Sequence, residues 1–150
     1  MSARRPLLLA ALALALVASV VSGCAGGQAH ATESSLPMAP MSMMPAEVQD
    51  GAVVVQQAYQ YAAANAGILT QIPCYCGCGA VGHTSNYACY VAGPDADGGL
   101  RYDLHALGCS ICVDITQDVM RMRAQEKDVG AIRAAIDATY ARYGPSNMPR

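Results

Sequence analysis

The chain has 150 residues, enough for one small domain but not for two of ordinary size. It contains no Trp or Phe, so its eight Tyr are the only large aromatic side chains, and its formal net charge is −2. The few basic residues form no basic patch in the sequence, which excludes nucleic acid as an expected partner.

The first 23 residues predict a signal peptide of the lipoprotein type. Two arginines precede an apolar run over residues 7–21, and small residues then lead to Cys24. The run is shorter than the ~20 residues that a membrane span usually needs. Residues 21–24 resemble the lipobox of bacterial lipoproteins, in which the cysteine becomes the lipidated first residue. We therefore expect an extracytoplasmic chain, anchored to a bacterial membrane by lipid on Cys24.

Residues 24–46 predict a flexible tether, followed by a cysteine-rich helical domain over residues 47–144 and a tail over residues 145–150. The tether is rich in small residues, Pro and Met and has no helical periodicity. Thioether sulfur is a soft donor that suits Cu(I), so the methionines are candidates for an auxiliary metal-capturing arm. Methionine without function in a Pro-rich linker is the alternative. The methionines concerned are Met38, Met41, Met43 and Met44.

Three main helices are predicted, over residues 45–65, 103–124 and 128–143. Between the first two, residues 73–79 contain Pro and Gly and predict a tight loop lined by thiols, and residues 90–92 predict a brief extended piece. The fold class is therefore all-α. The residues expected on the buried sides are Val54, Ala58, Tyr61 and Ala62, then Leu104, Leu107, Ile111, Ile115, Val119 and Met122, and finally Val129, Ile132, Ile136, Tyr140 and Tyr143.

Candidate metal ligands are concentrated in one stretch of the chain. When Cys24 is set aside, the other six cysteines all lie between Cys74 and Cys112, and two histidines lie among them. Helical rotation places His105, Cys109 and Cys112 on a stripe beside the apolar one, with Met120 as an auxiliary donor. We expect this face to meet the thiol loop. The predicted ligands are Cys74, Cys76, Cys78, His83, Cys89, His105, Cys109 and Cys112.

Donors that are mostly sulfur favour Cu(I) or Zn(II). Copper is preferred because the methionines add soft donors, and zinc stays open because sites of four thiolates, or of three thiolates and one imidazole, need no methionine. Eight donors suffice for two four-coordinate sites or a small thiolate cluster. The predicted function is binding of a soft metal for buffering, scavenging or delivery, with a metal donor or acceptor protein as a further partner.

Two other classes stay open. Three disulfides could staple a structural or interaction domain outside the cytoplasm. Alternatively, Cys109 and Cys112 form a Cys-x-x-Cys pair that could carry thiol–disulfide chemistry, although the pair is expected one turn inside the helix rather than at its start. No serine or carboxylate constellation indicates hydrolysis, and no enzyme activity is predicted.

Residues 73–78 carry the motif Pro-Cys-Tyr-Cys-Gly-Cys, which is followed by Gly82-His83 and Cys89. A second pattern runs from Tyr102 to Cys112 and includes Asp103, His105 and Cys109. These residues resemble the bacterial PCYCGC-motif lipoproteins, over about residues 50–143 and including the lipobox. The resemblance implies an extracytoplasmic lipoprotein domain and little about activity.

Overall fold

The structure is a computed structural model that describes residues 36–149. The predicted signal peptide, the lipidated Cys24 and the first part of the tether lie outside the described residues. Within residues 36–149, no helix is both long enough and apolar enough to cross a bilayer.

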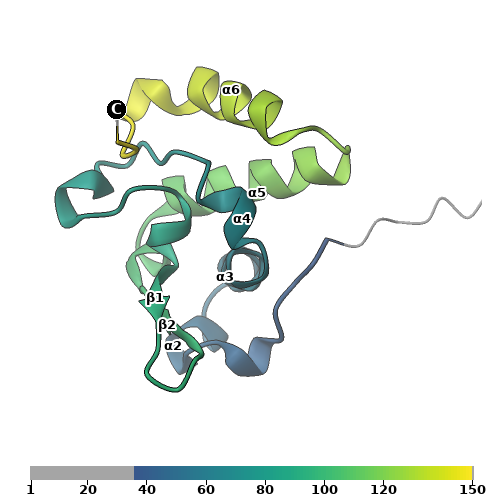
Figure 1. Cartoon of the computed structure of the whole chain (residues 1–150), viewed down its shortest axis with the longest axis vertical. Coiled ribbons are helices and arrows are strands. Elements are labelled where there is room, and N and C mark those ends of the chain that lie inside the picture. Colours follow the sequence, from purple (N-terminus) through teal and green to yellow (C-terminus); the bar gives the residue numbers. More distant parts are fainter. Residues whose placement is uncertain (1–35, 150) are drawn as a thin grey trace, which may run out of the picture. The chain divides into compact units, whose positions relative to one another are not determined.

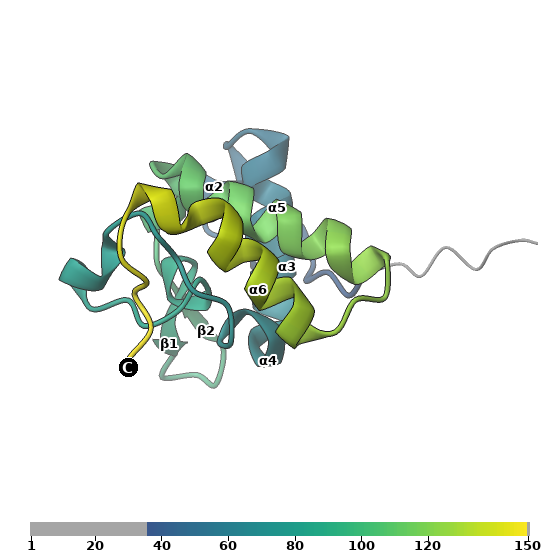
Figure 2. The same cartoon turned by 90° about the horizontal axis from the view of Figure 1, so that it is seen from above.

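Three long helices form the body of the domain: α3 (Val53–Ala64), α5 (Ser110–Ala124) and α6 (Val129–Tyr140). Helix α5 contacts both α3 and α6 and lies between them in Figure 1, and Figure 2 shows the same helices from above. Two single-turn helices, α2 (Ala46–Gln49) and α4 (Ala66–Leu69), flank α3. The prediction of a helical domain with three main helices is confirmed for the described residues.

The apolar periodicity identifies most of the core. Helix α5 buries Ile115, Val119 and Met122, and α6 buries Ile132, Ile136 and Tyr140. These spacings of three and four keep the side chains on one face of each helix. Three residues that were expected in the core are exposed, because they lie at or beyond the ends of the long helices. Val54 lies in the first turn of α3, Leu104 precedes α5, and Tyr143 follows α6 in the 3₁₀ turn η5 (Ala141–Tyr143).

The predicted helix over residues 103–124 begins only at Ser110, so its first part was wrong. His105 lies instead in a separate 3₁₀ turn, η4 (His105–Leu107). The Asp103 carboxylate accepts the backbone N–H of His105 at 2.8 Å, which stabilises this turn. The rotation that placed His105 on one helical stripe with Cys109 therefore does not apply. Cys109 is the N-cap of α5, so the Cys-x-x-Cys pair begins the helix rather than lying one turn inside it.

The predicted helix over residues 45–65 is interrupted at residues 50–52. The Gln56 side chain donates to the carbonyl oxygens of Gln49 at 2.6 Å and Gly51 at 3.0 Å, at the C-terminal end of α2. Helix ends leave such carbonyls without intrahelical partners, so these hydrogen bonds stabilise the break.

Residues 36–46, which the sequence places in the flexible tether, pack against α3. The Ala39 N–H donates to the Gln60 carbonyl at 3.0 Å, and the Gln60 amide donates back to the Ala39 carbonyl at 2.9 Å. The Asn65 amide donates to the Pro37 carbonyl at 2.8 Å. Met44 is only 4% exposed, so this segment contributes to the hydrophobic core.

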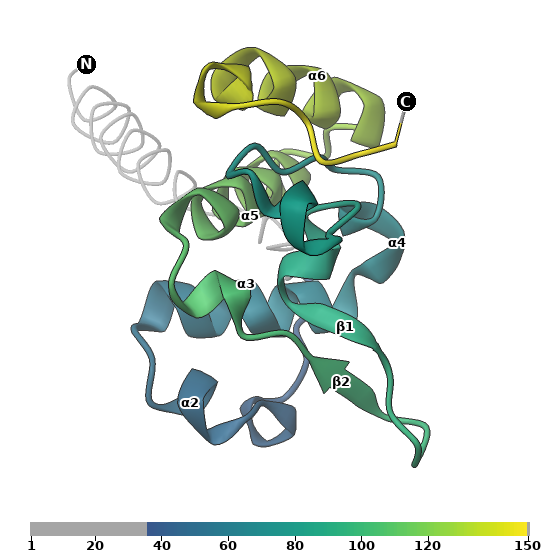
Figure 3. The ribbon, with the colours of Figure 1, turned by 90° about the vertical axis from the view of Figure 1, so that its left-hand side faces the viewer.

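A short antiparallel hairpin corrects the all-α class. Strand β1 (Val91–Pro94) pairs with β2 (Leu100–Tyr102), with an irregularity between Val91 and Gly93 (Figure 3). The sequence predicted the extended piece but not its partner strand. Just beyond the paired residues, the Asp103 N–H donates to the Tyr90 carbonyl at 2.9 Å. The hairpin thus brings the segment after the thiol loop beside the segment that leads into α5.

Candidate metal centre

The thiol loop has no regular secondary structure at residues 73–75 and bends at residues 76–77. The Sγ atoms of Cys74 and Cys76 lie 3.5 Å apart. Gly77 has a φ of +85°, a left-handed conformation that residues with a Cβ rarely adopt. The chain then enters the 3₁₀ turn η2 (Cys78–Val81), which buries Cys78. The glycine of the motif therefore turns the third cysteine inward.

Two residues outside the predicted ligands hold this loop in place. The Tyr75 hydroxyl donates to Oδ1 of Asp137 on α6 at 2.6 Å. Asn147, from the predicted tail, accepts the Cys74 N–H on its Oδ1 at 2.7 Å, and its own N–H donates to the Cys74 carbonyl at 3.0 Å. The Asn147 amide also donates to Sγ of Cys78 at 3.4 Å. The C-terminal segment is thus part of the site.

The start of α5 brings two cysteines to the loop. Sγ of Cys112 lies 3.5 Å from that of Cys74 and 3.6 Å from that of Cys76. Nε2 of His105 lies 3.6 Å from Sγ of Cys76. Cys109 is half-buried, and its Sγ lies within 4.8 Å of the ligand atoms of Cys76, His105 and Cys112. We call these four residues the outer set.

Cys89 reaches the site through a buried polar network. It lies in the 3₁₀ turn η3 (Tyr87–Cys89), and its Sγ is 3.7 Å from that of Cys78. The neighbouring Asn86 amide and Tyr90 hydroxyl both donate to the Cys112 carbonyl, at 3.2 and 2.8 Å. The Thr116 hydroxyl donates to Asn86 Oδ1 at 2.7 Å, which joins the turn to α5. Satisfied polar networks of this kind hold a buried arrangement in one geometry.

His83 is oriented by a carboxylate. Its Nε2 lies 3.3 Å from Oδ2 of Asp103, while its Nδ1 is buried and has no hydrogen-bond partner among the described residues. When Nε2 carries the proton and donates to Asp103, Nδ1 presents a lone pair. A carboxylate behind an imidazole is the usual support of a metal-bound histidine. The free Nδ1 therefore fits a ligand.

The predicted ligands converge on one region. The atoms within each of four overlapping groups lie within 4.8 Å of one another. A tetrahedral ion with Zn–S bonds of ~2.3 Å places its sulfur atoms about 3.8 Å apart, close to the spacings seen here. The Cys/His groups could therefore hold a metal ion. The groups are Cys76, His105, Cys109 and Cys112; Cys74, Cys76 and Cys78; Cys74, Cys89 and Cys112; and Cys78, His83 and His105.

The thiols cannot all ionise together without a cation. Hydrogen bonding with the thiols of Cys112 and Cys89 lowers the pKa of Cys74 well below its ordinary value. The bond to Cys74 correspondingly raises the pKa of Cys112. Burial, and then the negative charge on Cys74, raise the pKa of Cys76 and Cys78. Because a metal binds thiolates, its binding must release protons from this cluster.

The methionines are distributed differently from the thiols. Met44 belongs to the core, Met41 and Met120 pack half-buried against it, and Met38 and Met43 are exposed. Residues Leu36 and Pro37, at the start of this segment, line a hollow with Arg123 near the C-terminal end of α5. The thiols lie at the opposite end of α5. The auxiliary metal-binding role of the methionines stays a prediction.

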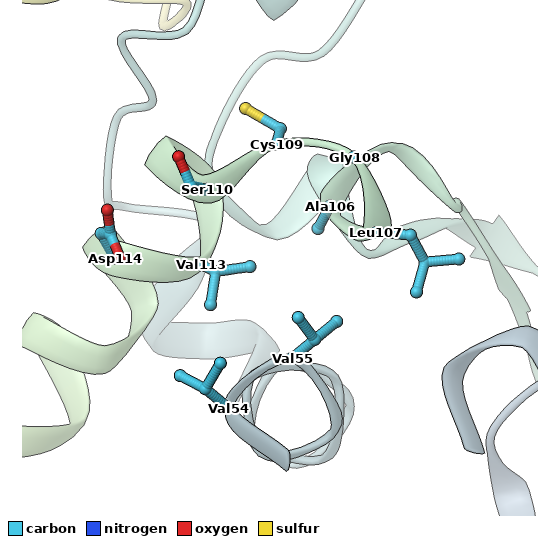
Figure 4. Close-up of a pocket in the computed structure, with 9 residues that line it drawn as sticks. All are labelled: Val54, Val55, Ala106, Leu107, Gly108, Cys109, Ser110, Val113 and Asp114. Carbon is cyan, nitrogen blue, oxygen red and sulfur yellow. The ribbon is translucent and has the colours of Figure 1, made fainter. Parts of the chain in front are cut away.

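An apolar hollow of about 370 Å³ lies beside the outer set, between the first turn of α3 and the start of α5. Val54, Val55 and Val113 project into it, whereas the sulfur of Cys109 points away (Figure 4). Cys109 thus lines the hollow with its backbone side, and its sulfur lies outside it.

The sequence model of the family described as a protein of unknown function with PCYCGC motif matches residues 8–149. The chain belongs to the PCYCGC family. Neither the curated proteins nor the solved structures gave a match. In this PCYCGC member, the cysteines of the motif form one side of the candidate centre, and the start of α5 forms the other.

Sequence reasoning missed the residues that support the ligands. Tyr75 lies within the PCYCGC motif, but no pattern indicated its partner Asp137 on α6. Asp103 stands two residues before a candidate histidine, a spacing that could have indicated a supporting carboxylate. Asn147 carried no signal because its contacts are with residues more than 60 positions away.

Proposed function

We propose that this domain binds a soft metal ion, preferably Cu(I), as an extracytoplasmic lipoprotein anchored through Cys24. The observation that supports it is the convergence of six thiols and two imidazoles on one region of a small domain. Thiolate sulfur prefers Cu(I) and Zn(II) to harder ions. The outer set would be the primary site.

Copper is preferred because the sulfur donors exceed what one structural zinc site requires. A closed zinc site uses four ligands, and the outer set alone could supply three thiolates and one imidazole. One zinc ion on the outer set leaves the thiols of Cys74, Cys78 and Cys89 without a metal, whereas Cu(I) readily takes sulfur-rich sites. Zinc on the outer set remains the alternative metal.

The exposure of the outer set favours exchange of the metal over permanent burial. Cys76, His105 and Cys109 are half-buried, while Cys112 is fully buried. A ligand of a partner protein could approach the first three and displace them one at a time. This supports buffering, scavenging or delivery to an acceptor at the same membrane.

The other two classes have less support. All six cysteines of the described residues are free, with sulfur separations of 3.5–3.7 Å where they touch, against ~2.05 Å in a disulfide. For thiol redox chemistry, the position of Cys109 at the start of α5 is favourable. However, the sulfur of the buried Cys112 makes its hydrogen-bond contacts with Cys74 at 3.5 Å and Cys76 at 3.6 Å, rather than with Cys109.

The test uses the full chain, purified anaerobically in detergent and reduced. Free thiols are counted, and Cu(I) and Zn(II) are then titrated against chelators of known affinity. The double variant Cys109→Ser with Cys112→Ser should lose metal affinity while the far-ultraviolet circular dichroism keeps its helical signal. Ser110→Ala, an exposed change between the two cysteines, is the matched control and should bind as the wild type does.

The proposal fails if the reduced wild-type chain takes up neither metal. It also fails if the chain forms three disulfides within the domain and binds no metal after reduction and reconstitution. Unfolding of the double variant would favour a structural role for the two cysteines.

A further inference from the structure

Three thiols form a second group behind the outer set. Cys74 and Cys89 are 0% exposed and Cys78 is 3% exposed. Sγ of Cys78 lies 3.7 Å from that of Cys89, and each lies within 4.8 Å of Sγ of Cys74. We call these three residues the inner trio. We propose that the domain binds two soft metal ions, one on the outer set and one in the inner trio. This inference rests on the proposed function.

The inner trio consists of buried sulfurs with one N–H donor beside them. Buried cysteines often act only as small apolar core residues. In this case the three sulfurs face one another rather than separate aliphatic partners. The Asn147 amide donates to Cys78 at 3.4 Å, and hydrogen bonds from N–H groups favour the thiolate form that a metal requires. Three thiolates can provide a trigonal, all-sulfur site for Cu(I).

Cys112 connects the two sites. Its Sγ lies within 4.8 Å of the sulfurs of Cys74 and Cys89, and also within 4.8 Å of the ligand atoms of the rest of the outer set. The distance to Sγ of Cys74 is 3.5 Å. A thiolate has enough lone pairs to bridge two ions. The geometry therefore describes one continuous cluster with a half-exposed end and a buried end, rather than two isolated sites.

This arrangement gives an order of filling. An incoming Cu(I) ion meets the half-exposed outer set first and passes inward by exchange of ligands through Cys112. Each thiol that coordinates releases its proton to solvent, and copper stays in the monovalent state throughout. The inner trio would hold an ion beyond the reach of solvent, while the outer set exchanges its ion with a partner.

The experiment measures stoichiometry on the reduced full chain in detergent, under anaerobic conditions. Cu(I) is added stepwise with a competing chelator, and bound ions are counted by native mass spectrometry. The wild type should reach two ions. Cys89→Ala should reach one, because the inner trio is broken while every residue of the outer set is kept. Cys78→Ala should give the same result through a different position.

The matched comparison is Cys109→Ala, which removes a half-exposed ligand of the outer set. It should weaken binding of the exchangeable ion, measured as faster loss of one ion to excess chelator. Wild-type saturation at one ion would overturn the two-ion inference and leave the proposed function standing, whereas uptake of no ion would overturn both. If Cys89→Ala and Cys78→Ala are both folded and each still binds two ions, the proposed site in the inner trio is overturned. If circular dichroism shows that both inner variants are unfolded, the wild-type count alone decides.

Discussion

Asn147 offers a sharp test of how the chain positions its thiols. Its side chain accepts the Cys74 N–H at 2.7 Å and donates to the Ser85 carbonyl at 3.1 Å and to Sγ of Cys78 at 3.4 Å. Asn147→Ala removes these three bonds, although the backbone bond from residue 147 to the Cys74 carbonyl can persist. The loop would then lose its main contact with the C-terminal segment.

The expected loss of stability follows from the buried polar groups that Asn147→Ala leaves without a hydrogen-bond partner. A buried donor that loses its acceptor costs about 1–3 kcal/mol. In a domain of this size, 1 kcal/mol corresponds to roughly 4 °C in Tm, so we expect a decrease of about 4–12 °C. Metal affinity should also fall, by about 10- to 100-fold, because loss of a group that orients the ligands has effects of this size.

The assay combines thermal unfolding of the reduced, metal-free chain with chelator competition for Cu(I). Ser146→Ala is the control, because this exposed neighbour makes no contact with the thiols among the described hydrogen bonds. Equal Tm and equal affinity in both variants would refute the reasoning. A lower Tm with unchanged affinity would show that Asn147 stabilises the fold without orienting the ligands.

Three further outcomes are expected. Asp103→Asn should weaken metal binding by about 10-fold or more, because an amide orients the His83 ring less strongly than a carboxylate; unchanged affinity in a folded variant would contradict the role of this pair. Tyr75→Phe should destabilise the chain near neutral pH by removing the hydroxyl that donates to Asp137. Burial, and then this hydrogen bond, raise the pKa of Tyr75 to about 12, so its contribution is present below an unfolded value of about 10 and is lost as the pH rises toward 12. The difference in unfolding free energy between wild type and Tyr75→Phe should therefore narrow over that interval, and a constant difference would argue against the bond. Finally, free metal at 100 times its Kd should stabilise the chain by ~2.7 kcal/mol per site, reversed by chelation, and an unchanged Tm would contradict binding to the folded state.

The helices could be predicted from the sequence because their signals are local. Ile132, Ile136 and Tyr140 recur at helical spacing, and Asp128 caps α6 by accepting the N–H of Ala131 at 2.8 Å. The boundaries were less predictable. The apolar pattern continues through residues 103–109, but the contact of Asp103 with His105 forms a separate turn there. A periodicity identifies which face is apolar, and it does not identify where a competing local hydrogen bond ends the helix.

The kinds of donor atom in the candidate centre could be predicted from the sequence. They depend only on the residue types, cysteine and histidine, that cluster between Cys74 and Cys112. Their arrangement is decided by contacts between segments far apart in the chain. The hairpin brings the thiol-loop segment beside the segment leading into α5, the Asn86–Thr116 hydrogen bond holds Cys89 near Cys112, and Asn147 joins the C-terminal segment to the loop. Such contacts depend on packing across the whole domain, and no local spacing encodes them. The sequence thus determined which atoms are available to a metal, and the tertiary structure decided which of them lie at the half-exposed end of the cluster and which are buried.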